Sequence, residues 1–487
     1  MSSLEATGHP QLDSRQGSRN REPPGLLLVV AAAFALRVYR LGYQSLWGDE
    51  AYSVWRASKD FIALTQEAHV EGTLPPLYYW LLHFWMPLAG QSEFAVRYLS
   101  LLFGVLTVPV AYCFVRRIFD PLTGLYAALV FAAAPFLVYY SQEARMYAQV
   151  TFFVLLSSCL LVRLTDRGDA PTGRARRTLW VAYALANVAA LLSHYFGGFV
   201  VLAQALYFGV FWWRHRVDGR EWVASQLAAG LLLAPWVIYI WSALQRTGDL
   251  VSRFGIGLDT IADRVLRAFS LGMSVAPKDA PTLLFGFVVL ALIGLASLRR
   301  LKGAFLGLYV VVPVLVTYVI SFAPQLDWPR YFIMASPGFY ALLARGMSVL
   351  HKGLPVLGLI GFLTVAVPSL VSLNNYYFDP RYARFDFRGQ MAEVEAPNGK
   401  QEAIIVNDLR QEAFSYYYKG LKPYSKVPRE GVEGRPEIEA ELARLAAGNE
   451  ALWLVKYMPP DYDPDNAIER WLAFNAYKVN DNWVQNI

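Results

Sequence analysis

The sequence has few charged residues for its length. Asp, Glu, Lys and Arg make up 17% of its 487 residues, whereas they make up about 25% of an ordinary soluble domain. Hydrophobic residues reach 55% and aromatic residues 15%. This balance excludes an ordinary soluble protein and indicates a chain embedded in lipid.

Cysteine is scarce as well. Cys113 and Cys159 are the two in the chain, and both lie inside apolar stretches, where a small buried thiol is the ordinary interpretation. A disulfide framework is therefore excluded. His69, Glu71 and His83 could ligate a metal, but their spacing matches no recognised ligand pattern. The sequence therefore predicts no specific cofactor and no set of metal ligands. Whether the protein binds a divalent cation is left open.

The net charge of +6 does not indicate a nucleic-acid partner. The basic residues fall mostly in short clusters between apolar runs, which is typical of cytoplasmic loops. Membrane lipids, and not nucleic acid, are the expected surroundings of this chain.

Apolar runs long enough to cross a ~30 Å hydrocarbon core recur along the chain. Eleven are expected, and they begin near Leu26, Tyr98, Leu122, Val150, Leu179, Phe196, Trp222, Pro281, Ala304, Tyr331 and Leu354. With the N-terminus inside, every inner loop is basic: Arg116 and Arg117; Arg163, Arg167, Arg174, Arg176 and Arg177; Arg214, Arg216 and Arg220; Arg299, Arg300 and Lys302; Arg345 and Lys352. The positive-inside rule thus favours an all-α multi-pass bundle with a cytoplasmic N-terminus.

The segment Leu74–Leu88 is apolar enough to be a twelfth span. It is short, begins with paired prolines and is rich in aromatic residues, which favours a helix lying in the outer interface. Counting it as a span would place every later loop on the opposite side of the membrane. The loop charges therefore favour eleven spans over twelve.

Composition divides the chain into three parts. Residues 1–24 are polar and lack apolar periodicity, which predicts a disordered cytoplasmic tail. Residues 25–373 form the transmembrane domain, with a first outer loop at 43–97. Residues 374–487 are polar, and alternating strand-like and helix-like segments predict a small extracytoplasmic α/β domain. Its role, acceptor handling or a structural cap, is open.

Two adjacent carboxylates, Asp49 and Glu50, follow the first span at the outer interface. A carboxylate in a partly desolvated cleft suits the deprotonation or orientation of an acceptor hydroxyl. Asp49 is the stronger catalytic candidate and Glu50 the second. The alternative is that one of them only caps the helix that follows.

A second pair, Glu143 and Arg145, lies in a very short outer turn between two spans. Charged groups at that depth are costly unless they are paired or functional. Arg145 could bind a donor phosphate bidentately, and Glu143 could orient it or share a metal. A plain ion pair between the two is the alternative.

Further polar residues lie at the outer ends of predicted spans. Arginine on this side runs against the topological bias, so a lipid phosphate or diphosphate could supply the counter-charge. Attachment to lipid headgroups is the alternative for each one. The candidates are Arg37, Arg40, Arg97, His194, Tyr195, Arg330 and Tyr331.

The ordered segments WGDEAYS, PPLYYWLLHFW, RYLSLLFG, YSQEARMYA, SHYFGGF and PRYF resemble the bacterial branch of the protein mannosyltransferase-like family (family 39 type). That family belongs to the GT-C superfamily, together with the lipid A aminoarabinose transferase. The resemblance extends from Leu26 to about Leu350. Members commonly have a His before the paired prolines, where this chain has Thr73 and Leu74, so no role resting on that His is carried over.

The resemblance implies a GT-C glycosyltransferase in the bacterial inner membrane that uses a polyprenyl-phosphate-linked sugar. The acidic residue of the first outer loop, Asp49 with Glu50 beside it, would lie at the active site. Arg145 and Arg330 would hold the phosphate, and direct displacement would invert the anomeric carbon. A glycan, a lipid or a protein is the expected acceptor.

Two other functions fit parts of the pattern. A lipid-linked sugar transporter or flippase would also be apolar and multi-pass, but transporters place polar groups near the midplane, often in two repeated halves. A polysaccharide ligase or polymerase would also act on the outer side, although its functional residues are expected in one large late loop. Polar groups gathered at the outer span ends, with an early acidic pair, favour the transferase.

Overall fold

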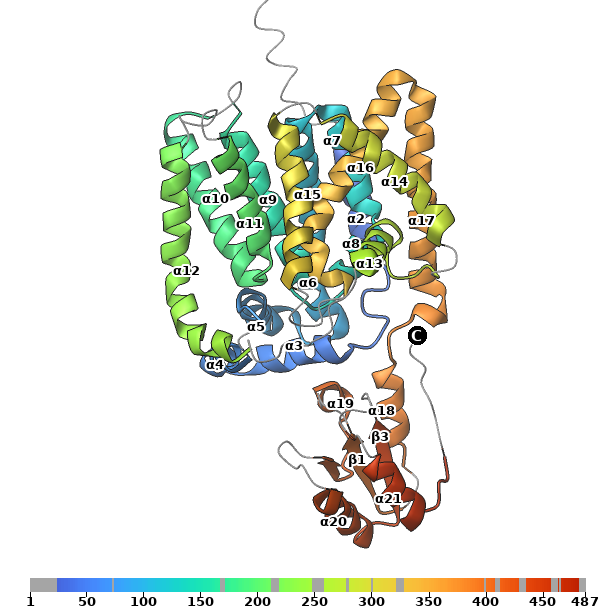
Figure 1. The fold of residues 1–487 in the computed structure, drawn as a ribbon. Coiled ribbons are helices and arrows are strands. Elements are labelled where there is room, and N and C mark those ends of the chain that lie inside the picture. Colours follow the sequence, from blue (N-terminus) through green and yellow to red (C-terminus); the bar gives the residue numbers. More distant parts are fainter. Residues whose placement is uncertain are drawn as a thin grey trace, which may run out of the picture.

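A computed structural model of the protein describes residues 24–71, 74–166, 171–211, 219–247, 258–276, 280–298, 301–320, 328–397, 400–407, 412–428, 435–456, 463 and 466–480. Except for Pro24, the predicted N-terminal tail lies outside these residues. The described chain forms a helical bundle with a smaller domain below one end (Figure 1). The predicted fold class, an α-helical bundle with a small C-terminal α/β domain, is confirmed.

The bundle is built from helices of very different lengths. Local signals set several boundaries: Ser92 caps α6 by accepting the amide hydrogen of Ala95, and Asp120 with Pro121 starts α7. The helices are α2 (Pro24–Val38), α6 (Glu93–Ile118), α7 (Pro121–Ala133), α8 (Pro135–Ser141), α9 (Tyr147–Leu164), α10 (Gly173–Ser193), α11 (Gly197–Val210), α12 (Gly219–Thr247), α13 (Leu258–Leu271), α14 (Ala280–Ala296), α15 (Leu301–Ile320), η3 (Pro329–Ala335), α16 (Ser336–Gly353) and α17 (Pro355–Phe378).

Within the described residues, six helical segments are long and apolar enough to cross a membrane, or seven if the bent pair α7 and α8 is one span. The six are Glu93–Ile118, Tyr147–Leu164, Gly219–Ala243, Gly303–Ile320, Pro329–Gly353 and Pro355–Phe378. Shorter apolar helices occupy Gly25–Val38, Gly197–Val210 and Pro281–Ala296. The expected number of eleven spans stays a prediction.

Three helices of the predicted first outer loop lie at the lower end of the bundle: α3 (Gly48–Ser58), α4 (Phe61–Glu71) and α5 (Leu77–Ala89) (Figure 1). The 13 residues of α5 extend about 20 Å, which is too short for a ~30 Å hydrocarbon core. The structure therefore favours the interfacial helix expected for the Leu74–Leu88 segment.

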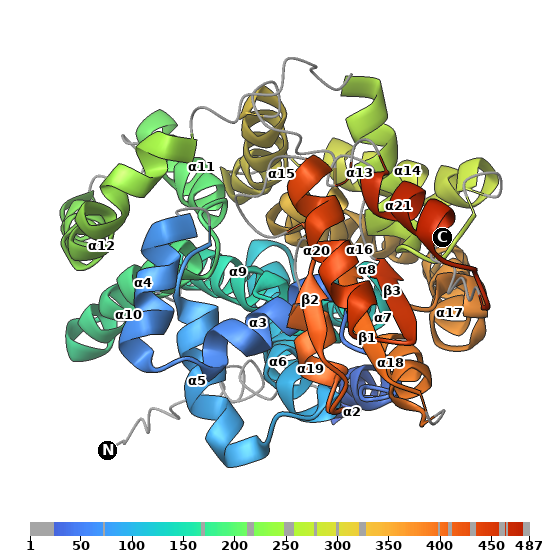
Figure 2. The same cartoon turned by 90° about the horizontal axis from the view of Figure 1, so that it is seen from below.

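The C-terminal domain contains a parallel three-stranded sheet of order β2-β1-β3. Its strands are β1 (Glu402–Asn407), β2 (Tyr424–Lys426) and β3 (Ala451–Lys456), and its helices are α18 (Phe387–Glu395), α19 (Glu412–Tyr417), α20 (Arg435–Ala447) and α21 (Ala467–Asn475). All six residues of β1 are buried, as expected for the central strand of a parallel sheet covered on both faces. Seen from below, α19 and the sheet lie next to α3, and α19 contacts α3 (Figure 2).

Helices α14 and α16 approach each other closely at two glycines. A Cβ atom at Gly294 would lie 2.2 Å from the carbonyl oxygen of Leu342, and one at Gly346 would lie 2.2 Å from that of Leu290. Small residues at such crossings allow helices to pack in a lipid environment, where burial of apolar surface gives little driving force. This contact holds α14 against α16 in the later part of the bundle.

We expect Gly346→Ala and Gly294→Ala to force α14 and α16 apart, because the added methyl group meets backbone. Each should lower the free energy of unfolding by about 1–3 kcal/mol, measured as thermal unfolding of the purified protein. Gly307→Ala in α15 is the control, since its Cβ would meet nothing within 4 Å. Unchanged unfolding temperatures for both contact variants would contradict the close approach.

Candidate active site

The acidic pair of the first outer loop lies in the first turn of α3, where carboxylates favour the helix N-terminus. The two neighbours differ in surroundings: the Glu50 side chain is fully buried, whereas that of Asp49 is 16% exposed. Glu50 Oε2 also accepts the amide hydrogen of Trp47 at 3.3 Å. The capping interpretation therefore describes part of the role of Glu50.

Glu50 is held by partners from distant parts of the chain. Arg97 binds it bidentately, at 2.8 Å from Nε to Oε1 and 2.7 Å from Nη2 to Oε2. Arg384 donates to Oε2 at 2.6 Å, and the amide of Ala144 donates to Oε1 at 2.8 Å. Burial acts to raise the pKa of Glu50, but Arg384 and Arg97 together lower it to about 2. Glu50 is therefore an ionised anchor, a poor base at neutral pH.

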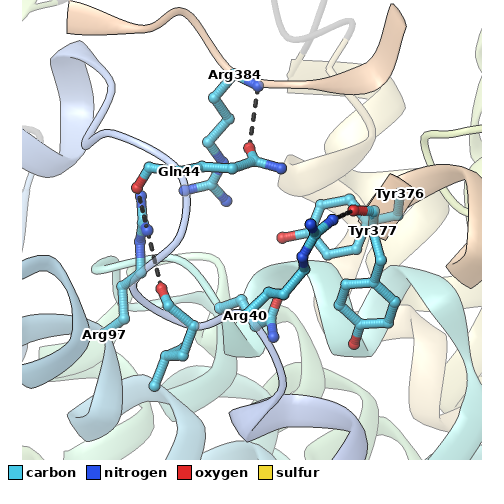
Figure 3. A pocket seen from close by; sticks show the side chains of 8 residues that line it. Arg40, Gln44, Arg97, Tyr376, Tyr377 and Arg384 are labelled. Carbon is cyan, nitrogen blue, oxygen red and sulfur yellow. Dashed lines mark hydrogen bonds between the residues drawn. The ribbon is translucent and has the colours of Figure 1, made fainter. Parts of the chain in front are cut away.

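Arg97 uses all five of its N–H donors within the protein. Besides Glu50, it donates to the carbonyl oxygens of Leu41 at 2.9 Å, Gln44 at 2.7 Å and Ser45 at 2.8 Å. Figure 3 shows Arg97 beside Gln44 and Arg384 in a small pocket at this point. Arg97 thus holds the segment before α3 and offers no donor to a phosphate.

Asp49 faces two arginines. Its Oδ2 lies 3.1 Å from Nη1 of Arg330 and 3.9 Å from Nη2 of Arg145. Arg330 comes from η3, and Arg145 from the turn between α8 and α9. The fold therefore brings together three residues that the sequence spreads over most of its length.

Both arginines keep a donor that no described residue accepts. Nη1 of Arg145 donates to the Tyr79 hydroxyl at 3.1 Å and lies 3.4 Å from Ser53 Oγ, but its Nε is buried and unpaired among the described residues. Nε of Arg330 is likewise buried and unpaired among the described residues. Buried guanidinium donors without acceptors are unusual, and they suit an anionic ligand with several oxygens.

Glu143 is buried beside these charges. Its Oε2 lies 3.9 Å from Nη2 of Arg384, and its Oε1 has no hydrogen-bond partner among the described residues. Burial raises the pKa of Glu143 to about 7, because the attraction of Arg384 is opposed by the nearby Glu50. The alternative of a plain ion pair with Arg145 is not what the structure contains: the Arg145 amide instead donates to the Glu143 carbonyl at 2.7 Å.

Two further arginines named from the sequence lie in other surroundings. Arg37 is fully buried and donates to Ser141 Oγ and to the carbonyls of Ala33, Phe131 and Ala132, so its guanidinium bridges α2, α7 and α8. Arg40 donates to the Tyr377 carbonyl and lies 4.0 Å from the Tyr43 ring centre. Arg37 therefore holds helices of the bundle together, and neither Arg37 nor Arg40 contacts Asp49.

The aromatic candidates have different neighbours. His194 follows α10, and burial, with the cations Arg145 and Arg330, lowers its pKa to about 3, which keeps the imidazole neutral. The Tyr331 ring centre lies 5.5 Å from the guanidinium of Arg330. The Tyr195 hydroxyl instead accepts a hydrogen bond from Trp236 at 3.3 Å.

The histidines of the first outer loop are engaged by backbone. His69 Nδ1 lies 2.6 Å from the Tyr239 carbonyl oxygen, and His83 Nδ1 lies 2.9 Å from that of Ala57. The side chain of Glu71 lies outside the described atoms. In the part of the chain that the structure describes, no group of three or more His, Cys, Asp and Glu could hold a metal ion.

Arg384 is a site residue that the sequence pattern did not indicate. It lies between α17 and α18, at the entry to the C-terminal domain, and its side chain is 7% exposed. The signal was a run of three arginines, Arg381, Arg384 and Arg388, directly after the last apolar run. In the sequence alone, these arginines indicate a solvent-exposed surface. The ion pair between Arg384 and Glu50 is visible only in the structure.

Comparisons with known proteins agree with this architecture. A family model described as dolichyl-phosphate-mannose-protein mannosyltransferase matches residues 73–241. The undecaprenyl phosphate-alpha-4-amino-4-deoxy-L-arabinose arabinosyl transferase of Pseudomonas aeruginosa is 30% identical over 164 residues, which are 33% of this chain and 29% of the relative. An uncharacterized protein of Aquifex aeolicus is 26% identical over 190 residues, 37% of this chain and 36% of the relative. The matches thus span about a third of the curated relatives.

Solved structures extend the likeness over the whole fold. ArnT from Cupriavidus metallidurans, bound to undecaprenyl phosphate, matches with a TM-score of 0.62 at 15% identity, over 94% of this chain and 97% of that one. These matches support the resemblance to mannosyltransferase-like and aminoarabinose-transferase proteins that the sequence motifs predicted. At 15% identity the match to ArnT shows a shared multi-helix fold.

A more distant match has the same bundle. The oligosaccharyltransferase AglB from Archaeoglobus fulgidus, in complex with an inhibitory peptide and a dolichol-phosphate, has a TM-score of 0.55 at 11% identity, over 82% of this chain and 64% of that one. At this identity the likeness concerns the fold alone. The roles of individual side chains therefore have to be argued from their geometry in this chain.

The raised pKa of Glu143 predicts a pH dependence of stability. An acid with a pKa of about 7 when folded, against an ordinary 4.5, binds its proton more tightly in the folded state. The folded state should therefore lose stability as pH rises from about 4.5 to about 7. Glu143→Gln mimics the protonated carboxyl, so its advantage in thermal unfolding temperature over the wild type should grow from pH 5 to pH 8. A constant difference across that range would contradict the raised pKa.

Proposed function

We propose that this protein is a glycosyltransferase that moves a sugar from a polyprenyl-phosphate donor to an acceptor hydroxyl. One observation supports it above the others: a partly exposed carboxylate, Asp49, lies against two arginines that each keep an unpaired buried N–H donor. Such a cluster offers a base for a hydroxyl and cationic donors for a phosphate side by side.

The proposed mechanism is a direct displacement. The acceptor oxygen attacks the anomeric carbon, the bond from that carbon to the phosphate oxygen breaks, and polyprenyl phosphate leaves. Arg145 and Arg330 stabilise the charge that grows on the phosphate, and Asp49 accepts the proton of the hydroxyl. Attack opposite the leaving group inverts the anomeric configuration.

The other predicted site residues have different roles in this proposal. Glu143 and the neutral His194 line the same charged region, and Tyr331 supports Arg330. Glu50 and Arg97 bind each other and the surrounding backbone, which supports a positioning role for both. Arg37 and Tyr195 have internal partners that favour structural roles.

The donor class is argued from the charged site and from relatives. Two of the structurally similar proteins were solved with a polyprenyl phosphate, undecaprenyl phosphate in one and dolichol-phosphate in the other. The aminoarabinose transferases that match about a third of the chain are named for an undecaprenyl-phosphate sugar. These names support a lipid-linked donor and leave the sugar, and a glycan, lipid or protein acceptor, to experiment.

A panel of radiolabelled polyprenyl-phosphate sugars, incubated with membranes that contain the protein, tests the proposed function. Incorporation of label into an acceptor with one donor and not with others supports it and identifies the sugar. Movement of the labelled lipid across vesicles without transfer would support the transporter alternative.

We also propose that the site opens to the outer side of the inner membrane, with the N-terminus inside. The acidic pair and the C-terminal domain lie at one end of the bundle (Figure 1). Basic residues gather at the other end: Lys352 and Arg345 both pair with Asp120. The positive-inside rule supports a cytoplasmic position for that second end.

This topology predicts opposite labelling of two exposed glycines. Gly448→Cys, in the C-terminal domain, and Gly353→Cys, at the end of α16, each place a thiol where a Cβ meets nothing within 4 Å. In spheroplasts, a membrane-impermeant maleimide should label the first and not the second. The wild type, with its two free cysteines, gives the background. The reverse pattern would contradict the proposed orientation.

Asp49→Asn should remove the base without removing the fold. We expect turnover to fall by about 10²-fold or more, the usual scale of general base catalysis. Stability should change by about 1 kcal/mol or less, because Asn replaces Asp well at a helix N-terminus. Asp60→Asn is the control: Asp60 accepts the amides of Ile62 and Ala63 at the start of α4. Full turnover in the Asp49 variant would exclude it as the base.

A further inference from the structure

The acidic pair follows a segment that has no regular secondary structure. Residues 41–47 make up most of the connection from α2 to α3, and the three carbonyls held by Arg97 fix one side of this segment. The direction in which Asp49 points depends on that segment and on the first turn of α3. Whatever holds residues 41–47 from the other side therefore bears on the proposed base.

The other side is held by the C-terminal part of the chain. The amide of Arg384 donates to Gln44 Oε1 at 3.0 Å (Figure 3), and Ser45 Oγ donates to Asp386 Oδ1 at 2.8 Å. From α19, the Tyr417 hydroxyl accepts the amide hydrogen of Leu46 at 2.6 Å and donates to Glu93 at 3.0 Å. The segment is thus enclosed between the bundle and the C-terminal domain.

Arg384 also reaches past this segment into the charged site. Its Nη1 donates to Glu50 Oε2 at 2.6 Å, and its Nη2 lies 3.9 Å from Glu143 Oε2. Arg384 therefore lies between two buried carboxylates. Without it, Glu50 and Glu143 would repel each other in a region from which water is largely excluded.

Glu50 connects the two parts of the proposed catalytic site. It follows Asp49 directly, and its Oε1 accepts the amide hydrogen of Ala144, which directly precedes Arg145. One carboxylate therefore fixes the backbone that carries the base relative to the backbone that carries the phosphate ligand. Displacement of that carboxylate would move both residues at once.

We propose that Arg384 is a positioning residue: by holding Glu50, it sets Asp49 and Arg145 at their working separation, so that the C-terminal segment completes the active site. This inference rests on the proposed function. It gives the C-terminal domain a task in catalysis that is separate from any binding of acceptor. Misplacement of reacting groups by about 1 Å can lower a rate by about 10²-fold.

Kinetics of Arg384→Gln provide the first test. We expect kcat to fall about 10- to 100-fold and the KM for the lipid donor to change less than kcat, because Arg384 sets the separation of Asp49 and Arg145 and makes no donor contact of its own. Arg384→Lys should recover part of kcat, since an ammonium still pairs with Glu50. Wild-type kcat in Arg384→Gln, or a raised KM with unchanged kcat, would overturn the inference.

Arg381→Gln is the matched control. Arg381 lies three residues earlier, its side chain is 72% exposed, and its ion pair is with the neighbouring Asp379. It should retain wild-type kcat and KM. A loss equal to that of Arg384→Gln would show that any change in this segment is harmful and would overturn the specific role.

A double variant tests whether Arg384 acts through Glu50. If it does, Glu50→Gln with Arg384→Gln should have a kcat within about threefold of Glu50→Gln alone. Losses that multiply would mean that the two side chains act separately. Should the double variant fail to accumulate in the membrane, the comparison of Arg384→Lys with Arg384→Gln decides.

Hydrogen exchange gives a readout that does not depend on activity. In Arg384→Gln, amides of residues 44–50 and 144–146 should exchange faster, while those of α20 keep their wild-type rates. Faster exchange throughout the C-terminal domain would indicate general unfolding and overturn the inference. A wild type inactive with every donor would refute the proposed function, and hydrogen exchange would still decide the positioning role.

Discussion

The structure depends on one buried carboxylate, Glu50, and on the cations around it. Burial of an ionised group is costly unless its charge and its lone pairs are matched. Here two guanidinium groups and two backbone amides match them. The partners come from the residue before α3, from α6, from the α8–α9 turn and from the segment after α17, so this network ties the segment that follows α2, the bundle and the C-terminal domain together.

This anchor explains why two adjacent acids have different surroundings. Neighbouring side chains on a helix point about 100° apart, so when Glu50 turns inward, Asp49 faces Arg145 and Arg330. The inward residue is kept ionised by its arginines, and its oxygens are occupied. Asp49 stays partly exposed, and this exposure gives a substrate access to it.

The charge balance around the pair is positive. Arg97, Arg145, Arg330 and Arg384 face Asp49, Glu50 and Glu143, and the raised pKa of Glu143 makes this last carboxyl neutral for part of the population near pH 7. An excess of one to two positive charges in a largely buried site attracts an anion. A phosphate has several oxygens that accept hydrogen bonds, so it can bind donors from more than one of these arginines.

The amino-acid sequence by itself determined the membrane class, the helical bundle and the α/β character of the C-terminal domain, because hydrophobicity and periodicity are local properties of a segment. It also located Asp49, Glu143, Arg145 and Arg330 as charged residues at span ends. Tertiary structure alone decided which charges are already paired: Arg37 and Arg97 bind internal partners, and Arg384 pairs with Glu50 across 334 residues. Ion-pair partners are chosen by the packing of distant segments, and no local pattern records that choice.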